Sequence, residues 1–327
     1  MCAYELSKKF DSDDSNIFCQ IHPHSISPKA IIQINNTLNL LDFENVVDMS
    51  TENYNLYSRI CLLLKIILLR LRLKDKSFRI ILGDFNNSIT HLARIIYNPI
   101  EVIIIDDGFF SYELWRDFLS NGIYFTCRNN VLSNVLKFFN LYKKLEKSPV
   151  TLFSVYSSYI KSSNIKVNDF SEIKKLFNVK DKKINSDLVF VIGNKLSERG
   201  ALSIKDELWH LIKIYNFWKK QGKHITYIAK RTSSESKLNS IEHLGYKVLI
   251  PEYPIELDLL LSDFLPKYIC GYGFSTIFST LPLFFPDLRY FNTKFPTDKF
   301  SYSSDVEQYL GFVELSKKSK YIEWIDV

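Results

Sequence analysis

The chain has little cysteine and little glycine for its 327 residues. Its five cysteines, at positions 2, 19, 61, 127 and 270, lie far apart and include no Cys-x-x-Cys pair. This spacing excludes a disulfide framework and a zinc site of the usual kind, and it is typical of reduced thiols in a cytoplasmic protein. The ten glycines form no Gly-x-Gly-x-x-Gly, no Walker loop and no Gly-x-Ser-x-Gly elbow. The sequence therefore gives no sign of a dinucleotide fingerprint, a P-loop or a hydrolase elbow.

The chain also lacks a long uncharged apolar run. The best candidate, residues 60–73, is too short to span a bilayer and is interrupted by Lys65, Arg70 and Arg72. We expect an amphipathic basic helix there, either packed on a sheet with its cations in water or attached to an anionic membrane. Residues 1–16 are polar and acidic, so no secretory signal is expected. We expect a cytoplasmic protein, with attachment to the inner face of the inner membrane left open.

The length and charge of the chain limit the number of domains and the classes of partner. The length suggests two domains, because compact domains average about 150 residues. A hydrophobic content of 46% is ample for two cores. The net charge of +6 is small. It suits an anionic substrate or an anionic membrane surface, and it gives no reason to expect nucleic acid as a partner.

Short apolar runs alternate with helical stretches along most of the chain, which is the pattern of parallel sheets covered by helices. In the first half we expect strands at 17–21, 46–49, 79–82 and 102–105, and helices at 28–41, 54–73 and 89–97. In the second half we expect strands at 188–192, 225–228, 247–250 and 268–270, and helices at 204–221, 234–244, 255–264 and from 275 onward.

The two halves are separated by a stretch without periodicity. Residues 171–185 carry five lysines and are interpreted as the end of the first domain followed by a solvated linker. The sequence thus predicts an α/β protein with two Rossmann-like domains, 1–180 and 181–327, facing across a cleft. Whether the last segment packs back on the first domain is left open.

A buried strand followed by two acids is the clearest motif of the first half. Residues 102–105 are Val-Ile-Ile-Ile, and Asp106, Asp107 and Gly108 follow directly. A fully apolar run is typical of a parallel strand covered on both faces, and ligands of such sheets gather at the carboxyl ends of the strands. The alternative is that the acids only form a turn and cap the next helix. Asp84 follows the preceding strand, and His91 lies on the helix after it, where it could contact a ligand or be structural.

In the second half, small residues follow two of the expected strands. Gly193 and Asn194 end the first, where a glycine would let a backbone N–H approach a phosphate or a sugar, although an ordinary strand exit is equally compatible. Gly273, Ser275 and Thr276 lead from a later strand into a helix, and their hydroxyl and N–H groups could hold a phosphate.

Charged residues follow the other strands. Lys230 and Arg231 come just after a strand and before a helix N-cap, which is Ser233 or Ser234. Cations beside free N–H groups make an anion site, although a solvated Lys-Arg pair is the alternative. Glu256 opens the next helix, where an acid is expected for dipole reasons, and where it could also grip ribose hydroxyls.

Taken together and in order, these motifs resemble the bacterial sialyltransferase group. The nearest members are the lipooligosaccharide sialyltransferases (glycosyltransferase family 52) and the capsule polysialyltransferases (family 38). The resemblance covers residues 84 to about 281 and is clearest in the second half; the first 80 residues match only in layout. It implies a GT-B type glycosyltransferase with a CMP-sialic acid donor, inversion at the anomeric carbon and no cofactor or metal.

The resemblance also implies roles for individual residues. The second acid of the acidic turn is the general base of the group, which corresponds to Asp107, and Asp106 would orient it or bind acceptor hydroxyls together with Asp84, His91 and Gly108. The donor phosphate would be bound at Lys230-Arg231 and Ser275-Thr276. Gly193, Asn194, Glu256 and Gly273 would complete the nucleotide site. The acceptor would be a glycan or glycolipid of the bacterial surface: lipooligosaccharide, O-antigen or capsule.

One position departs from the group, which commonly has histidine where this chain has Lys230. Lysine can neutralise a departing phosphate as a fixed charge, but it is a poor proton donor near neutral pH. The donor could therefore be another nonulosonic acid or a UDP- or GDP-activated sugar. A catalytically degenerate glycosyltransferase acting as a binding subunit is a further alternative.

Overall fold

The structure is a computed structural model of residues 1–327. It describes residues 1–9, 18–20, 28–43, 46–48, 56–73, 79–85, 88–106, 108, 110–124, 134, 138–146, 150–160, 162–177, 179 and 182–327. The chain divides into two compact units. Unit 1 comprises Met1–Ile26 and Asp42–Ile173, and unit 2 comprises Ser27–Leu41 and Lys174–Val327.

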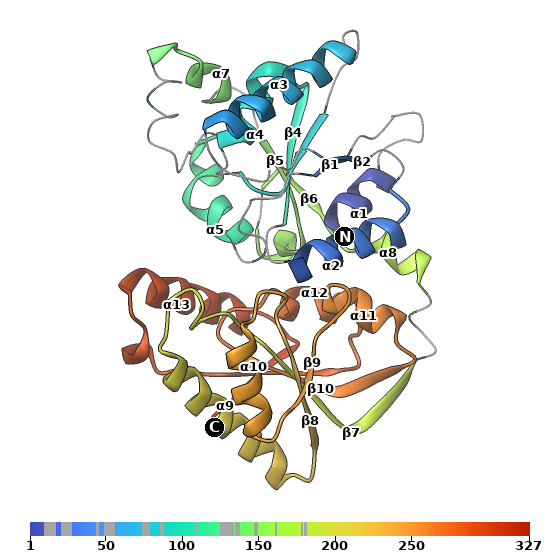
Figure 1. Cartoon of the computed structure of the whole chain (residues 1–327), viewed down its shortest axis with the longest axis vertical. Coiled ribbons are helices and arrows are strands. Elements are labelled where there is room, and N and C mark those ends of the chain that lie inside the picture. The colour runs from blue at the N-terminus through green and yellow to red at the C-terminus, as the bar shows by residue number, and fades with distance from the viewer. Residues whose placement is uncertain are drawn as a thin grey trace. The chain divides into compact units, whose positions relative to one another are not determined.

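Unit 1 contains a parallel four-stranded sheet of order β3-β4-β5-β6 (Figure 1). Its strands are β3 (Arg79–Leu82), β4 (Glu101–Ile105), β5 (Val150–Ser154) and β6 (Ile165–Val167). A separate parallel pair is formed by β1 (Phe18–Gln20) and β2 (Val46–Asp48). The helices are α1 (Cys2–Lys9), α3 (Leu56–Arg72), α4 (Ser88–Tyr97), α5 (Phe110–Asp117) and α7 (Tyr142–Glu146), with 3-10 turns at Leu119–Asn121 and Val155–Tyr159. The apolar run in β4 is buried, which confirms the expected inner strand.

Unit 2 is built on an all-parallel sheet of order β12-β11-β10-β7-β8-β9. Its strands are β7 (Lys183–Ile192), β8 (His224–Ile228), β9 (Lys247–Leu249), β10 (Phe264–Tyr272), β11 (Arg289–Thr293) and β12 (Ile322–Ile325). The main helices are α2 (Pro28–Leu40), α9 (Ile204–Lys220), α10 (Glu235–His243), α11 (Ile255–Leu261), α12 (Ile277–Phe284) and α13 (Ser303–Lys317), with a 3-10 turn at Thr297–Lys299. The chain winds outward from β7 to β9 and then starts again at β10, on the other side of β7. This is the order of a doubly wound nucleotide-binding sheet, so the predicted α/β class with Rossmann-like domains is confirmed.

The core of unit 2 is rich in aromatic side chains. Val189, Tyr227 and Tyr272 of the sheet pack with residues of α9, α10 and α13 in one buried cluster. Trp218 of α9 lies with its ring centre 5.2 Å from that of Tyr268. This packing fixes the faces of the sheet, and therefore fixes which residues emerge at the strand ends.

The observed units differ from the expected domains in one helix. Helix α2, expected in the first domain, belongs to unit 2. There the side-chain amide of Gln33 donates to the backbone carbonyls of Pro251 (3.3 Å) and Tyr253 (2.7 Å). At the other end of the chain, β12 pairs with β11 and so belongs to unit 2 as well.

The expected linker at 171–185 contains regular structure. Helix α8 (Ser171–Leu176) begins there, because the buried carboxylate of Glu5 accepts hydrogen bonds from the N–H groups of Glu172 and Ile173. Strand β7 begins at Lys183 and β10 at Phe264, earlier than expected, because the exposed first residues of β7 pair with the start of β10. The pairing shifts register after Pro266, which has no N–H to donate.

Candidate functional site

The acidic turn of unit 1 follows β4 directly. Its first carboxylate, Asp106, accepts a hydrogen bond from the hydroxyl of Ser154 (2.6 Å) and another from the N–H of Val155 (2.7 Å). Burial raises the pKa of Asp106 to about 6, and these hydrogen bonds oppose the rise. Both carboxylate oxygens are thus engaged by the end of β5. Asp106 therefore fixes the turn, and acceptor contacts by this carboxylate would have to compete with Ser154 and Val155.

The other predicted residues of unit 1 have different surroundings. Asp107, the expected base, lies outside the described residues. Gly108 follows it in a turn before α5, and its carbonyl accepts from the N–H of Ser111 (3.2 Å). Asp84 is half-buried just beyond β3. The parallel pairing of β3 and β4 brings Asp84 to the same edge of the sheet as Asp106.

His91 lies in the interior of unit 1 and not on a surface that an acceptor could reach. Its side chain is fully buried, and its ring packs edge-on against Phe85 with centroids 5.6 Å apart. The neighbouring guanidinium group of Arg94 is also buried and donates to the carbonyls of Tyr124 (2.9 Å) and Leu145 (3.2 Å). Burial lowers the pKa of Arg94 to about 10. These contacts give His91 and Arg94 a structural role, the alternative that the sequence left open.

In unit 2, β7 and β10 are adjacent and mark the point where the strand order reverses. Ligands of doubly wound sheets bind beyond the carboxyl ends of the strands at such a point. Asn194 joins the two ends, because its side-chain amide donates to the carbonyls of Tyr272 (3.0 Å) and Phe274 (3.2 Å). Its Oδ1 atom accepts from the N–H of Lys195 (3.1 Å). Asn194 therefore holds the loops in place, and its polar atoms are already used.

Two predicted glycines are required by this local packing. A Cβ atom on Gly193 would lie 2.6 Å from the carbonyl oxygen of Ile228 and 2.7 Å from the hydroxyl of Tyr227. The N–H of Gly193 donates to that same carbonyl (2.8 Å), so it is not available to a phosphate. Gly273 adopts a left-handed φ of 71°, and a Cβ there would lie 3.1 Å from the amide nitrogen of Asn194.

The loop between β10 and α12 presents a buried hydroxyl without a partner. Ser275 is only 4% exposed, and its hydroxyl has no hydrogen-bond partner within the part of the chain that the structure describes. Thr276 follows as the N-cap of α12 without making a side-chain cap hydrogen bond. After β8, Ser234 caps α10, and the hydroxyl of the preceding Ser233 is likewise unpartnered among the described residues. Orphaned hydroxyls are costly in a folded protein unless a ligand or water completes them.

Cations gather at the same edge of the sheet. Lys230 is half-buried just after β8, and burial lowers the pKa of its ammonium group. The positive charges of Arg231 and Lys195 lower this pKa too, while the negative charge of Glu256 raises it. Glu256 is itself held by the hydroxyl of Thr280, which donates to its Oε1 at 2.6 Å. Two cations and one acid therefore act on Lys230, and a bound anion would offset the repulsion between the cations.

A buried ionic network behind this edge was missed from the sequence. The ammonium group of Lys237 donates to Oε1 of Glu207 (2.8 Å), to Oε2 of Glu198 (2.9 Å) and to the carbonyl of Asn194 (2.7 Å). The hydroxyl of Tyr272 donates to the same Oε1 of Glu207 (2.9 Å). A signal was present, because Glu207 lies on the stripe of α9 that carries Leu211, Ile214 and Trp218 in the core.

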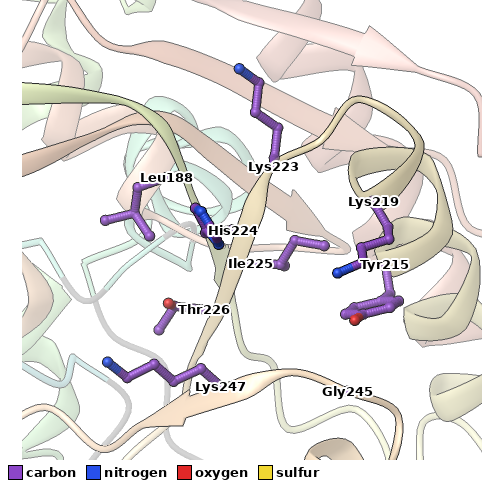
Figure 2. A pocket seen from close by; sticks show the side chains of 9 residues that line it. All are labelled: Leu188, Tyr215, Lys219, Lys223, His224, Ile225, Thr226, Gly245 and Lys247. Carbon is purple, nitrogen blue, oxygen red and sulfur yellow. The ribbon is translucent and has the colours of Figure 1, made fainter.

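A cavity of about 370 Å³ lies at the opposite, amino-terminal edge of the sheet. It is lined by Leu188, Tyr215, Lys219, Lys223, His224, Ile225, Thr226, Gly245 and Lys247. Figure 2 shows the side chains of Lys223 and Lys247 at opposite ends of the group of lining residues, with their amino groups directed away from each other. Lys223 is also already held by the carbonyl of Ser186 (3.0 Å). The cations of this cavity thus do not converge, unlike the groups at the carboxyl edge.

Within the ranges that the structure describes, no three His, Cys, Asp or Glu side chains are grouped as a metal ion would require. In the same ranges, no helix is long and apolar enough to cross a membrane.

No family model and no curated protein matches the sequence. Among solved structures, the chain is similar to a Listeria monocytogenes protein assigned as a UDP-N-acetylglucosamine 2-epimerase, with 8% identity and a TM-score of 0.48. The match covers 89% of this chain and 73% of that protein. The fold class rests on the strand order of the chain itself.

Proposed function

We propose that the chain is an inverting, metal-independent glycosyltransferase that uses a nucleotide-activated sugar. More specifically, we propose that it moves sialic acid or a related nonulosonic acid from a CMP donor to a hydroxyl of a bacterial surface glycan. The observation that supports this proposal most directly is the grouping of polar and charged residues at the carboxyl edge of the unit 2 sheet. There the unpartnered hydroxyl of Ser275 lies at the reversal of strand order, and Lys230 and Arg231 follow the neighbouring β8.

The chemistry of a nucleotide phosphate fits these groups. A phosphate oxygen accepts hydrogen bonds, which would complete the hydroxyl of Ser275, and its negative charge would offset the positive charges of Arg231 and Lys195 beside Lys230. A bound phosphate would stabilise the protonated form of Lys230 and reverse the lowering of its pKa. Glu256, oriented by Thr280, is placed on a neighbouring helix where a carboxylate could accept hydrogen bonds from ribose hydroxyls.

In the proposed reaction the bond between the anomeric carbon and the phosphate oxygen breaks, and its electron pair leaves with CMP. The acceptor oxygen forms the new bond to the anomeric carbon, and its proton passes to Asp107. Lys230, Arg231 and the hydroxyl of Ser275 stabilise the charge that develops on the departing phosphate. The role of Asp107 rests on the resemblance to the sialyltransferase group and on its position after β4. Lys230 acts as a fixed charge where the group has histidine.

A thermal-shift panel of CMP, UDP and GDP with the whole chain tests this proposal. We expect CMP to raise the melting temperature, since a ligand at about 100 times its Kd stabilises the folded state by about 2.7 kcal/mol. A response to UDP alone would overturn the CMP assignment and leave a nucleotide-sugar enzyme. A protein that responds to none of the three would overturn the proposal as a whole. If the chain binds CMP but releases no CMP from CMP-sialic acid with any of the acceptor glycans tested, the result would favour a binding subunit.

A further inference from the structure

Helix α3 of unit 1 uses one stripe of its surface for packing. Leu62 and Ile66 are each 3% exposed and pack with Leu69 of the same helix and with Ile96 and Tyr97 of α4. The hydroxyl of Tyr97 donates to the carbonyl of Ile66 at 3.1 Å. This contact fixes the rotation of α3, so the opposite face of the helix is turned to solvent.

That opposite face is also apolar. Ile60, Leu64, Ile67, Leu68 and Leu71 are spaced so that they form one stripe along the helix. Leu64 is 51%, Leu68 63% and Leu71 60% exposed. Single exposed apolar residues are common, but an unbroken exposed stripe of leucine and isoleucine marks an interaction surface.

Cations border this stripe on both sides. An α-helix turns by 100° per residue, which places Lys65 and Arg72 along one border of the exposed stripe and Arg70 along the other. All three cations thus lie between the exposed stripe and the packed one. Lys65 and Arg72 are exposed, and residues 56–73 contain no acid. Long basic side chains in this position can keep their charge in water while their stems cover apolar surface. The arrangement matches an interfacial helix, with apolar side chains below and cations at the level of the phosphates.

A second exposed element of the same kind lies in unit 1. Phe138 and Phe139 are 81% and 63% exposed, and the exposed Lys143 and Lys144 follow on α7. Helix α4 packs against both α3 and α7 (Figure 1). Helix α3 and the segment from Phe138 to α7 thus lie on either side of α4 in the contact order. Both expose aromatic or aliphatic side chains together with lysine or arginine.

We propose that α3 is a membrane-docking helix whose exposed stripe inserts into the surface of an anionic lipid bilayer. Lys65 and Arg72 would contact lipid phosphates, each at a cost in affinity when removed, whereas the guanidinium group of Arg70 donates to the carbonyl of Leu73 (3.3 Å). A second copy of the chain fits less well, since an α3–α3 contact would bring cations against cations. This inference does not depend on the proposed transfer reaction.

The test is sedimentation of the whole chain with phosphatidylcholine vesicles, with and without phosphatidylglycerol. We expect binding only to the anionic vesicles, weakened by salt. The variant Leu64→Gln/Leu68→Gln/Leu71→Gln should lower the partition coefficient at least about tenfold, because it removes the inserted apolar surface. Lys65→Gln/Arg72→Gln should lower it about 25-fold, since each basic residue near the surface contributes about fivefold.

The matched control replaces three scattered leucines of unit 2 with comparable exposure, Leu176→Gln/Leu261→Gln/Leu310→Gln. It should bind vesicles like the unmodified chain. Circular dichroism and thermal melting should be unchanged for all variants, because the substituted side chains are exposed. The proposal is overturned if the unmodified chain ignores anionic vesicles, or if the control loses binding as much as the α3 variant. Dimerisation that the α3 variant abolishes, without vesicle binding, would assign the stripe to a second copy instead.

Discussion

The ammonium group of Lys237 and the carboxylate of Glu207 form a buried ion pair at 2.8 Å, directly behind the loop that follows β7. Lys237 is 2% exposed and Glu207 fully buried, so neither charge has access to water. The same ammonium group holds the carbonyl of Asn194, and Asn194 holds the loop after β10. The ion pair is therefore the support on which the proposed phosphate site rests.

Removing one partner of this pair should strongly destabilise unit 2. We expect Lys237→Met to lower the free energy of unfolding by about 3–5 kcal/mol, because it leaves a buried carboxylate uncompensated. Chemical denaturation followed by tryptophan fluorescence measures this, since Trp218 lies in the core of unit 2. Lys220→Met, at an exposed lysine of α9, should change stability by less than about 0.5 kcal/mol. Equal effects of the two changes would remove the structural role given to Lys237.

Ser275 should show opposite effects on stability and on binding. Ser275→Ala removes a buried hydroxyl without a partner, so the free protein should keep its stability or gain up to about 1 kcal/mol. Its affinity for CMP should fall about tenfold, the value of one lost hydrogen bond to a charged group. Calorimetric titration and thermal melting measure the two quantities. Ser240→Ala, whose hydroxyl donates to the carbonyl of Ser236, is the control and should alter neither. Unchanged CMP affinity in Ser275→Ala would exclude Ser275 from the site.

Lys230 should make nucleotide binding depend on pH in the alkaline range. Its protonated form binds phosphate, and its pKa lies below the ordinary 10.5 because of burial and the neighbouring cations. CMP affinity should therefore be highest at pH values below that pKa, and it should fall as the pH rises through it. This fall should begin at a lower pH than it would for an ordinary lysine. Lys230→Arg should abolish this fall, since guanidinium keeps its charge. A wild-type affinity that is flat to pH 10.5 would contradict the assignment.

The same residue should matter for turnover. Lys230→Ala should cost roughly 2–4 kcal/mol of transition-state stabilisation, the scale of one preorganised donor. Lys230→His should recover part of this loss, increasingly at lower pH where imidazole is charged. The turnover of the wild type, Lys230→Ala and Lys230→His at two pH values shows whether Lys230 acts as a fixed charge. Equal turnover of the three proteins would mean that Lys230 has no role.

Asp107→Asn should abolish transfer and leave nucleotide affinity nearly unchanged, because the base acts on the acceptor and not on the donor. The expected loss is on the order of 10²-fold or more in kcat. Donor titration and release of CMP in the presence of acceptor measure the two quantities. Turnover near the wild-type rate would remove Asp107 from the mechanism and direct attention to Asp106.

Local patterns in the sequence were sufficient for the inner strands and for the positions of the loops. The Ile-rich run of β4 and the turns after β7, β8 and β10 could be located because each joins a buried strand to polar residues. The roles of individual residues within those loops could not be predicted in this way. That the N–H of Gly193 is taken by Ile228, or that Asp106 is held by Ser154, depends on partners far away in the chain.

Long-range contacts also explain the elements that were misjudged. Helix α8 depends on Glu5 for its N-terminal cap, and β7 begins in exposed residues that only pairing with β10 makes into a strand. Helix α2 was assigned to the first domain by order along the chain, while its contacts with Pro251 and Tyr253 belong to unit 2. The Lys237–Glu207 pair could have been suspected, since each is a charged residue on an otherwise buried helix stripe.

The central claim, that a nucleotide binds at the carboxyl edge of the unit 2 sheet, is tested most directly by hydrogen–deuterium exchange with and without CMP. The account predicts slower exchange at residues 193–197, 229–234 and 273–280, which form the loops after β7, β8 and β10 and the first turn of α12. It predicts no change at residues 215–226 and 245–247, which line the cavity at the opposite edge. Protection confined to that cavity, or no protection anywhere in unit 2 at saturating CMP, would contradict the account.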